Sequence, residues 1–231
     1  MSRFPLEPPV IQAQAIERCF QGGGLQVMAV NGVSLDIRKG EMLIIMGRSG
    51  SGKTTLLNLL GGLDRPTGGT ILWQGQDTAA MSEKEFTRWR SQNVGFVFQS
   101  FGLLPLLSAF ENVDLALGIR GVRRQERRQR ALEALKDVGL ASRVAHRPYE
   151  LSGGEQQRLA IARALAVNPT VVLADEPTGD LDSATAKDIA QLLKGMADQM
   201  NVAVVVATHD VTFMPLADRI EEIADGRLKA T

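Results

Sequence analysis

The chain has 231 residues, of which 44% are apolar, and this is enough to bury a core in one large domain. Lysine plus arginine and aspartate plus glutamate each number 26, so the zero net charge excludes a general attraction to nucleic acid or anionic lipid. The single cysteine, Cys19, excludes an internal disulfide and a cysteine-cluster zinc site. Binding must therefore come from local sites.

The sequence offers no segment suited to crossing or reaching a membrane alone. Proline interrupts residues 1–10, where a signal peptide needs a continuous apolar stretch, which predicts no export by that route. The longest aliphatic runs, 42–46 and 202–207, are far shorter than the roughly 20 residues that span a bilayer. Work at a membrane would therefore require a partner.

Short β-branched runs alternate with helical patterns, which is typical of an α/β fold with a largely parallel sheet. The runs expected to be strands are 27–37 (with an interruption), 42–46, 70–73, 94–98, 170–174 and 202–207. The expected helices are 53–61, 82–91, 108–118, 123–138, 153–167 and 183–199. The strands near 42, 171 and 202 are apolar throughout, as in strands that helices cover on both faces.

The segment 100–150 differs from its surroundings because it is rich in helical patterns and has no convincing strand. We expect one domain over 1–231, in which 1–99 and 151–231 form the core and 100–150 is an inserted helical subdomain. The basic run at 123–130 is expected to be a solvated face, with a lipid or partner contact as the alternative. Asp-Gly within 219–230 predicts a hairpin.

The clearest motif is 47-GRSGSGKT-54, which follows an expected strand and precedes an expected helix. Its glycines let successive backbone N–H groups point at phosphates, Lys53 reaches the β- and γ-phosphates, and the Thr54 hydroxyl binds Mg²⁺. The candidate nucleotide-binding residues here are Gly47, Arg48, Ser49, Gly50, Ser51, Gly52, Lys53, Thr54 and Thr55. The motif predicts a site for a nucleoside triphosphate with Mg²⁺.

Three further polar residues follow apolar strands. Asp175, at the end of 171-VVLADE-176, is expected to hold Mg²⁺ through water. Glu176 is expected to point elsewhere, because strand residues alternate faces, and to be the general base that polarises the attacking water. His209 follows the run 202–207 and is expected to bond the γ-phosphate, since ligands of open α/β sheets bind at the carboxyl ends of strands.

A second glycine-rich stretch, 151-LSGGEQQRLAIARALA-166, begins another expected helix. A helix N-terminus carries unpaired N–H groups and partial positive charge, which suits an anionic group. The chain therefore has two phosphate-binding motifs about a hundred residues apart.

The motifs at Gly47–Thr54, Gln99, Leu151–Gln156, Val171–Glu176, Asp182 and His209 resemble, in this order, the nucleotide-binding subunit of an ATP-binding cassette (ABC) transporter. The resemblance covers nearly the whole chain. It implies an ATPase whose P-loop core carries an antiparallel β part and an inserted helical subdomain. ATP and Mg²⁺ are the implied ligands.

The resemblance also implies a head-to-tail homodimer that forms on ATP binding, in which each signature motif caps the ATP of the other subunit. Ser152, Gly153 and Gly154 would contact the γ-phosphate in trans. Glu155 stands where the family more often has glutamine.

Three other positions take roles from the resemblance alone. Phe20 would stack on adenine, although the family usually has tyrosine there; a core phenylalanine is the alternative. Gln99 would reach the metal and the attacking water and link the helical subdomain to the core. The loop 178–182 would cross between subunits, and its Gly179-Asp180 departs from the more frequent Ser-Ala.

The stretches 61–69, 99–113 and 174–182 look most like the LolD/MacB-like ATPases of lipoprotein release and macrolide export. This group implies integral membrane permease subunits as partners, no nucleic acid, and a peripheral position at the cytoplasmic face of the inner membrane. The apolar segment 101–107 is the expected permease dock, tested by changing Leu104 and Leu107 to Asp; the alternative is that these leucines are core residues.

Two other classes share some of these motifs. An FtsE-like regulatory ATPase would act on a membrane partner without transport. ABC ATPases of DNA repair, chromosome structure or translation carry zinc modules, coiled-coil insertions or tandem cassettes, whereas this sequence has one cysteine and one cassette. A catalytically inactive module is disfavoured because Lys53, Asp175, Glu176 and His209 are all present.

Overall fold

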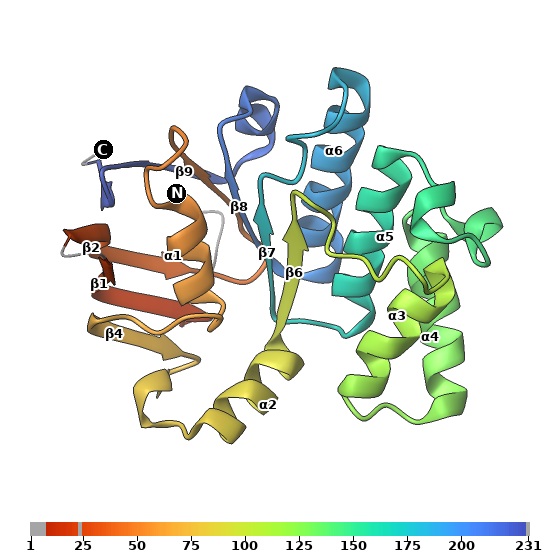
Figure 1. Ribbon diagram of the computed structural model, residues 1–231, viewed down its shortest axis with the longest axis horizontal. Helices are drawn as coiled ribbons and strands as arrows, with labels where there is room; N and C mark the ends of the chain where they lie inside the picture. The colour runs from red at the N-terminus through yellow and green to blue at the C-terminus, as the bar shows by residue number, and fades with distance from the viewer. Residues whose placement is uncertain (1–7, 23–24, 230–231) are drawn as a thin grey trace.

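The computed structural model describes residues 8–22 and 25–229. Residues 1–7, on which most of the signal-peptide prediction rests, lie outside the described residues. The fold is α/β with two sheets (Figure 1). The first sheet is antiparallel in the order β2-β1-β4-β5, with strands β1 (Ile11–Gly22), β2 (Leu25–Ile37), β4 (Gly68–Trp73) and β5 (Gln76–Asp77).

The central sheet has the order β10-β9-β3-β8-β7-β6. Its strands are β3 (Met42–Met46), β6 (Val94–Phe98), β7 (Val171–Asp175), β8 (Ala203–Thr208), β9 (Arg219–Ala224) and β10 (Arg227–Leu228). All of its pairs are parallel except β9 with β10, which form the hairpin that Asp-Gly predicts. The carboxyl ends of the parallel strands therefore meet at one edge of the sheet.

Six α-helices are described, at the places that the sequence predicts and with ends shifted by two residues at most. They are α1 (Lys53–Leu60), α2 (Glu83–Asn93), α3 (Ala109–Ile119), α4 (Arg124–Asp137), α5 (Gly153–Ala166) and α6 (Ser183–Met200). Short 3₁₀ segments are η1 (Thr78–Ala80), η2 (Ala141–Arg143), η3 (Pro148–Glu150) and η4 (Val211–Leu216). Serine capping boxes begin α2, α3 and α5, because each hydroxyl accepts a bond from the first turn and a glutamate bonds back.

Alternation along the central strands separates two apolar cores. Leu43 and Ile45 of β3 pack with α1 and the antiparallel sheet, whereas Met42 and Ile44 pack with α5, α6 and the neighbouring helices. Figure 1 shows α3, α4 and α5 together on the side opposite β1, β2 and β4. The middle of the central sheet is thus covered on both faces, which explains why β3, β7 and β8 are apolar along nearly their whole length.

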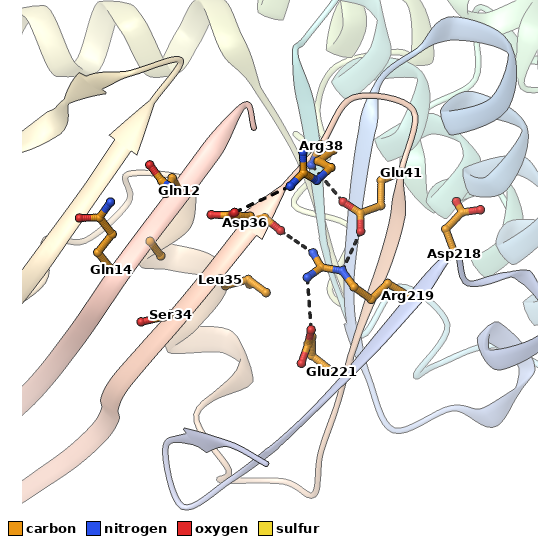
Figure 2. A pocket seen from close by; sticks show the side chains of 11 residues that line it. Gln12, Gln14, Ser34, Leu35, Asp36, Arg38, Glu41, Asp218, Arg219 and Glu221 are labelled. Carbon is orange, nitrogen blue, oxygen red and sulfur yellow. Dashed lines mark hydrogen bonds and ion pairs between the residues drawn. The ribbon is translucent and has the colours of Figure 1, made fainter. Parts of the chain in front are cut away.

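A network of charged groups joins the two sheets at the amino end of the central strands (Figure 2). The Arg219 guanidinium lies 2.7 Å from a Glu41 oxygen and 3.2 Å from Glu221, and it also donates to the carbonyl of Asp36. Glu41 accepts a second bond, of 3.0 Å, from the Arg38 backbone N–H and is only 3% exposed. These groups line a cavity of about 670 Å³.

The antiparallel sheet contains the main difference from the sequence prediction. Strand β1 is absent from the predicted strands, and β2 is one continuous strand where an interruption is expected. Ala15 has φ +45°, and the pairing of β1 with β2 shifts register on both sides of Ile16. This irregularity breaks the two-residue alternation by which a strand is recognised in sequence.

Candidate nucleotide-binding site

A cleft of about 580 Å³ opens at the carboxyl end of the central sheet. It brings together most of the residues that the sequence motifs select, although they come from distant parts of the chain. The lining residues are Val27, Met28, Ala29, Ser49, Gly50, Gly52, Lys53, Thr54, Thr55, Gln99, Asp175, Glu176, His209, Asp225 and Gly226. Four strand ends, those of β3, β6, β7 and β8, therefore bring their polar residues to one place.

The loop between β3 and α1 requires glycine. Gly50 and Gly52 have φ of +78° and +105°, a region that other residues rarely adopt. A Cβ atom on Gly52 would lie 2.2 Å from the Ala29 carbonyl oxygen. The Lys53 ammonium donates to the carbonyls of Gly47 (2.7 Å) and Arg48 (3.1 Å), so the loop folds around a buried positive charge.

Asp175, the last residue of β7, has unused hydrogen-bonding capacity. Its Oδ1 is buried and has no hydrogen-bond partner among the described residues. Burial raises the pKa of Asp175, although a hydrogen bond with Thr54 and the charge of Lys53 oppose the rise. A buried carboxylate oxygen without a partner costs stability, which marks it as a ligand for something else.

Glu176 lies just past β7 and is held by three neighbours. Its Oε1 is 3.2 Å from the Lys53 ammonium, and its Oε2 accepts from the Thr208 hydroxyl (3.0 Å) and lies 3.0 Å from His209 Nδ1. Burial alone would raise the pKa of Glu176, but hydrogen bonds from His209, Thr208 and Lys53 outweigh it and lower the pKa. An ionised carboxylate in this position can accept a proton from water.

The expected alternation of Asp175 and Glu176 does not describe their arrangement. Glu176 has φ +44°, outside strand geometry, and both side chains line the same cleft. Glu176 itself has left-handed rather than extended backbone, so the period-two rule of a strand does not apply to its side chain. The two acids therefore line the same cleft, where the rule predicts opposite faces.

Gln99, just after β6, connects the cleft to the loop 178–182. Its Nε2 donates to Asp180 (3.3 Å). A Cβ atom on Gly179 would lie 3.0 Å from the same nitrogen, so glycine leaves room for the glutamine. Gly179 and Asp180, which stand where the family more often has Ser and Ala, thus contact Gln99 directly.

Phe20 lies at the margin of the cleft rather than among its lining residues, and 42% of it is exposed. It pairs across β1 and β2 with Val27, which does line the cleft, and directly opposed side chains share a face of the sheet. The Arg18 guanidinium lies 4.6 Å from the centre of its ring and pairs with Asp64 at 2.7 Å. One face of the ring is thus occupied by a cation.

The signature residues at the start of α5 stand apart from this cleft. Ser152 caps the helix by accepting from the Glu155 N–H (3.3 Å), and a Cβ on Gly153 would lie 3.3 Å from Leu181. None of Ser152, Gly153, Gly154 and Glu155 is among the residues that line the cleft. Two phosphate-binding motifs of one chain therefore occupy separate places.

Sequence reasoning missed the contribution of β2 and of the β9–β10 turn to the cleft. The Gly226 N–H donates to the Ser51 carbonyl (3.0 Å), and the Gly226 carbonyl accepts from Asn31 (2.8 Å). Asp-Gly signals the turn but not where it packs. Only the tertiary fold places Asp225 and Gly226 beside the phosphate-binding loop.

The chain is similar to known proteins of one family. The sequence pattern of the ABC transporter family matches residues 30–179. The lipoprotein-releasing system ATP-binding protein LolD of Chromohalobacter salexigens is 46% identical over 95% of this chain and 92% of its own length. The macrolide export ATP-binding/permease protein MacB of Brucella abortus is 45% identical over 95% of this chain, but over only 34% of its own length.

A solved structure is similar throughout. It is the dimeric post-hydrolysis state of the ATP-binding cassette MJ0796 of Methanocaldococcus jannaschii, bound to ADP and Pi. It shares 43% identity and a TM-score of 0.88, over 95% of this chain and 97% of that chain. Within residues 8–22 and 25–229, no helix is long and apolar enough to span a bilayer.

Proposed function

Because the chain belongs to the ABC transporter family, we propose that it is the ATP-hydrolysing subunit that drives a membrane permease of the LolD/MacB type. The observation that carries the proposal is the cleft that unites Lys53, Glu176 and His209 at the carboxyl end of the sheet. An FtsE-like regulatory role is the alternative, and the membrane protein that copurifies with the chain separates the two.

The cleft suits a nucleoside triphosphate with Mg²⁺. Mg²⁺ keeps several waters and is bound by one or two carboxylates together with substrate phosphates, rather than by a cage of protein ligands. The buried Oδ1 of Asp175, which has no hydrogen-bond partner within residues 8–22 and 25–229 and lies beside Thr54, fits that demand, with Gln99 lining the same cleft. Bound Mg²⁺ would neutralise phosphate charge, and Thr54, Gln99 and Asp175, the last through water, would hold it.

The remaining residues of the cleft have separate tasks in hydrolysis. Backbone N–H groups of the loop 47–54 and the Lys53 ammonium hold the phosphates. Glu176 accepts the proton of the attacking water, since its carboxylate is kept ionised by its neighbours. His209, 3.0 Å from Glu176, orients it and reaches toward the γ-phosphate. Phe20 stacks on adenine with its free face.

Two copies of the chain complete the site. In each copy the signature residues 152–155 are separate from the cleft, and MJ0796 forms a dimer with ADP and Pi. We place the α5 N-terminus of one subunit against the triphosphate held by the other, where glycines and helix N–H groups suit an anion. ATP then joins the two subunits head to tail.

The apolar loop 101–107, which precedes α3, provides the permease contact. Leu104 and Leu106 are 43% and 79% exposed, whereas Leu107 is half-buried. The buried Asn112 donates to the carbonyls of Leu104 and Leu107, and Arg163 of α5 donates to those of Phe101 and Gly102. An apolar loop held this firmly can receive a permease helix at the cytoplasmic face of the membrane. We take 1–99 with 151–231 as the ATP-binding core of one domain and the segment 100–150 as its inserted helical subdomain.

A dimerisation assay tests the ATPase proposal. Glu176→Gln should retain ATP binding and stop hydrolysis, so that ATP traps a dimer with doubled mass in size exclusion. Adding Ser152→Arg to this variant should remove the dimer while leaving the ATP affinity of the dilute monomer unchanged. If Glu176→Gln stays monomeric with ATP and hydrolyses it at the full rate, both the general-base role of Glu176 and ATP-dependent dimerisation are contradicted. If the double variant loses affinity for ATP as a dilute monomer, the signature residues act on the ATP of their own subunit.

The permease contact has its own test. Leu106→Asp should release the membrane partner during purification from native membranes without changing ATP binding by the isolated subunit, because its side chain is mostly in solvent. Leu107→Asp is the matched variant in the same loop and should instead weaken folding. Loss of ATP binding in Leu106→Asp would show that the leucine supports the fold.

A further inference from the structure

Glu155 places a negative charge at the start of the signature helix. It is the third residue of α5, and its Oε2 accepts from the Ser152 backbone N–H at 2.9 Å. The partial positive charge of a helix N-terminus is what favours an anion there, and a carboxylate in the first turn cancels part of it. A glutamine would make the same capping bond without the charge.

One arginine compensates this carboxylate. Nε of Arg143 lies 2.9 Å from Oε1 of Glu155 and donates to it. The Ser152 backbone bond and the Arg143 guanidinium hold the pKa of Glu155 below its ordinary value, so Glu155 is ionised at neutral pH. Arg143 is thus the cation that the structure pairs with the signature carboxylate.

The backbone around Arg143 is fixed by its own contacts. In η2 the Arg143 N–H donates to Leu140 (2.9 Å), and its carbonyl accepts from His146 (2.9 Å). The same loop is tied to the start of α3, because Ala109 donates to the carbonyl of His146 (2.7 Å). The arginine is therefore presented to Glu155 from a well-anchored turn rather than from a free chain.

We propose that Arg143 is a positioning residue that neutralises Glu155, so that the signature helix of one subunit can approach the triphosphate held by its partner. This inference rests on the head-to-tail dimer of the proposed function. Without Arg143, the uncompensated carboxylate would face phosphate oxygens of the same sign, and like charges brought together across an interface oppose association. The pair also orients Glu155 toward the Ser152 N–H and keeps the helix cap formed.

The test uses the full chain with Glu176→Gln, in which ATP is not consumed, and measures ATP-dependent dimerisation by sedimentation at several protein concentrations. Arg143→Ala should weaken the dimer about tenfold, because it leaves Glu155 uncompensated. Glu155→Gln added to Arg143→Ala should restore the parent affinity, since it removes the charge that needs compensation. Arg143→Lys should retain most of the parent affinity.

Two controls separate charge from structure. Arg147 is an exposed arginine in the same segment, and its guanidinium donates to the Tyr149 hydroxyl. Arg147→Ala should leave the dimer affinity unchanged. Raising the salt concentration should shrink the Arg143→Ala defect, because screening acts on exposed charges but not on a packing fault.

The outcomes are distinct. A double variant as weak as Arg143→Ala alone, or a defect that salt does not reduce, would assign Arg143 a purely structural role and overturn the inference. An unchanged dimer in Arg143→Ala would overturn it as well. If the Glu176→Gln parent does not dimerise with ATP, the head-to-tail dimer of the proposed function is contradicted, and so is the inference that rests on it.

Discussion

Two charged cavities lie at opposite ends of the central sheet, and the one at the amino end, with about 670 Å³, is larger than the nucleotide cleft, with about 580 Å³. At the amino end, Glu41 and Arg219 satisfy each other. At the carboxyl end, Asp175 keeps a buried oxygen without a partner in the described chain. An unsatisfied hydrogen-bond acceptor, rather than a larger volume, therefore distinguishes the nucleotide cleft from the cavity around Glu41 and Arg219.

The sharpest test of this contrast is Asp175→Asn. It should reduce ATP hydrolysis about 100-fold, since the proposed water-mediated contact with Mg²⁺ would be lost. The same change should raise the free energy of unfolding of the nucleotide-free protein by about 1 kcal/mol, because an ionisable group no longer lies buried without a full set of partners. Steady-state turnover and urea unfolding give the two numbers. A parallel loss of activity and stability would make Asp175 a structural residue.

At the other end, Glu41→Ala should act in the opposite sense. It leaves Arg219 without its buried partner and should lower the free energy of unfolding by about 2 kcal/mol, with turnover per folded molecule unchanged. Glu222→Ala is the matched control, because its pair with Lys229 is exposed on both sides and is worth less than about 0.5 kcal/mol. A turnover defect in Glu41→Ala at full folding would give the amino-end cavity a role in the reaction.

The smallest effect is expected at the rim of the cleft. Phe20→Leu should raise the KM for ATP about fivefold, since stacking on adenine is worth about 1 kcal/mol, while kcat is unchanged. Arg18→Met should raise the KM for ATP about twofold, because the guanidinium that lies over the Phe20 ring is lost. Inhibition by tripolyphosphate, which has no base, is the control. Equal weakening of tripolyphosphate would show that Phe20 supports the phosphate loop instead of adenine.

The sequence predicts the carboxyl-end residues well because their signals are local. Lys53 follows a glycine-rich loop between a strand and a helix, and Asp175 ends an apolar strand, so a few neighbouring residues determine each placement. The class of fold and the helices follow from the same short-range patterns.

What the sequence does not predict depends on contacts between distant segments. Strand β1 escapes detection because its bulge breaks the alternation. Leu106 gives no sign in the sequence that it is more exposed than Leu107, since both belong to one apolar run and their burial depends on the tertiary fold. The pairing of Arg143 with Glu155 likewise depends on how η2 packs against α5.

The bond from the Gly226 N–H to the Ser51 carbonyl has a consequence for folding. Ser51 belongs to the phosphate-binding loop between β3 and α1, early in the chain. Gly226 lies in the turn between β9 and β10, about 175 residues later. A chain emerging from the ribosome acquires the loop long before the turn that braces it. Such a nascent chain should bind ATP only after β9 and β10 have docked, so premature pairing of incompletely folded subunits is avoided.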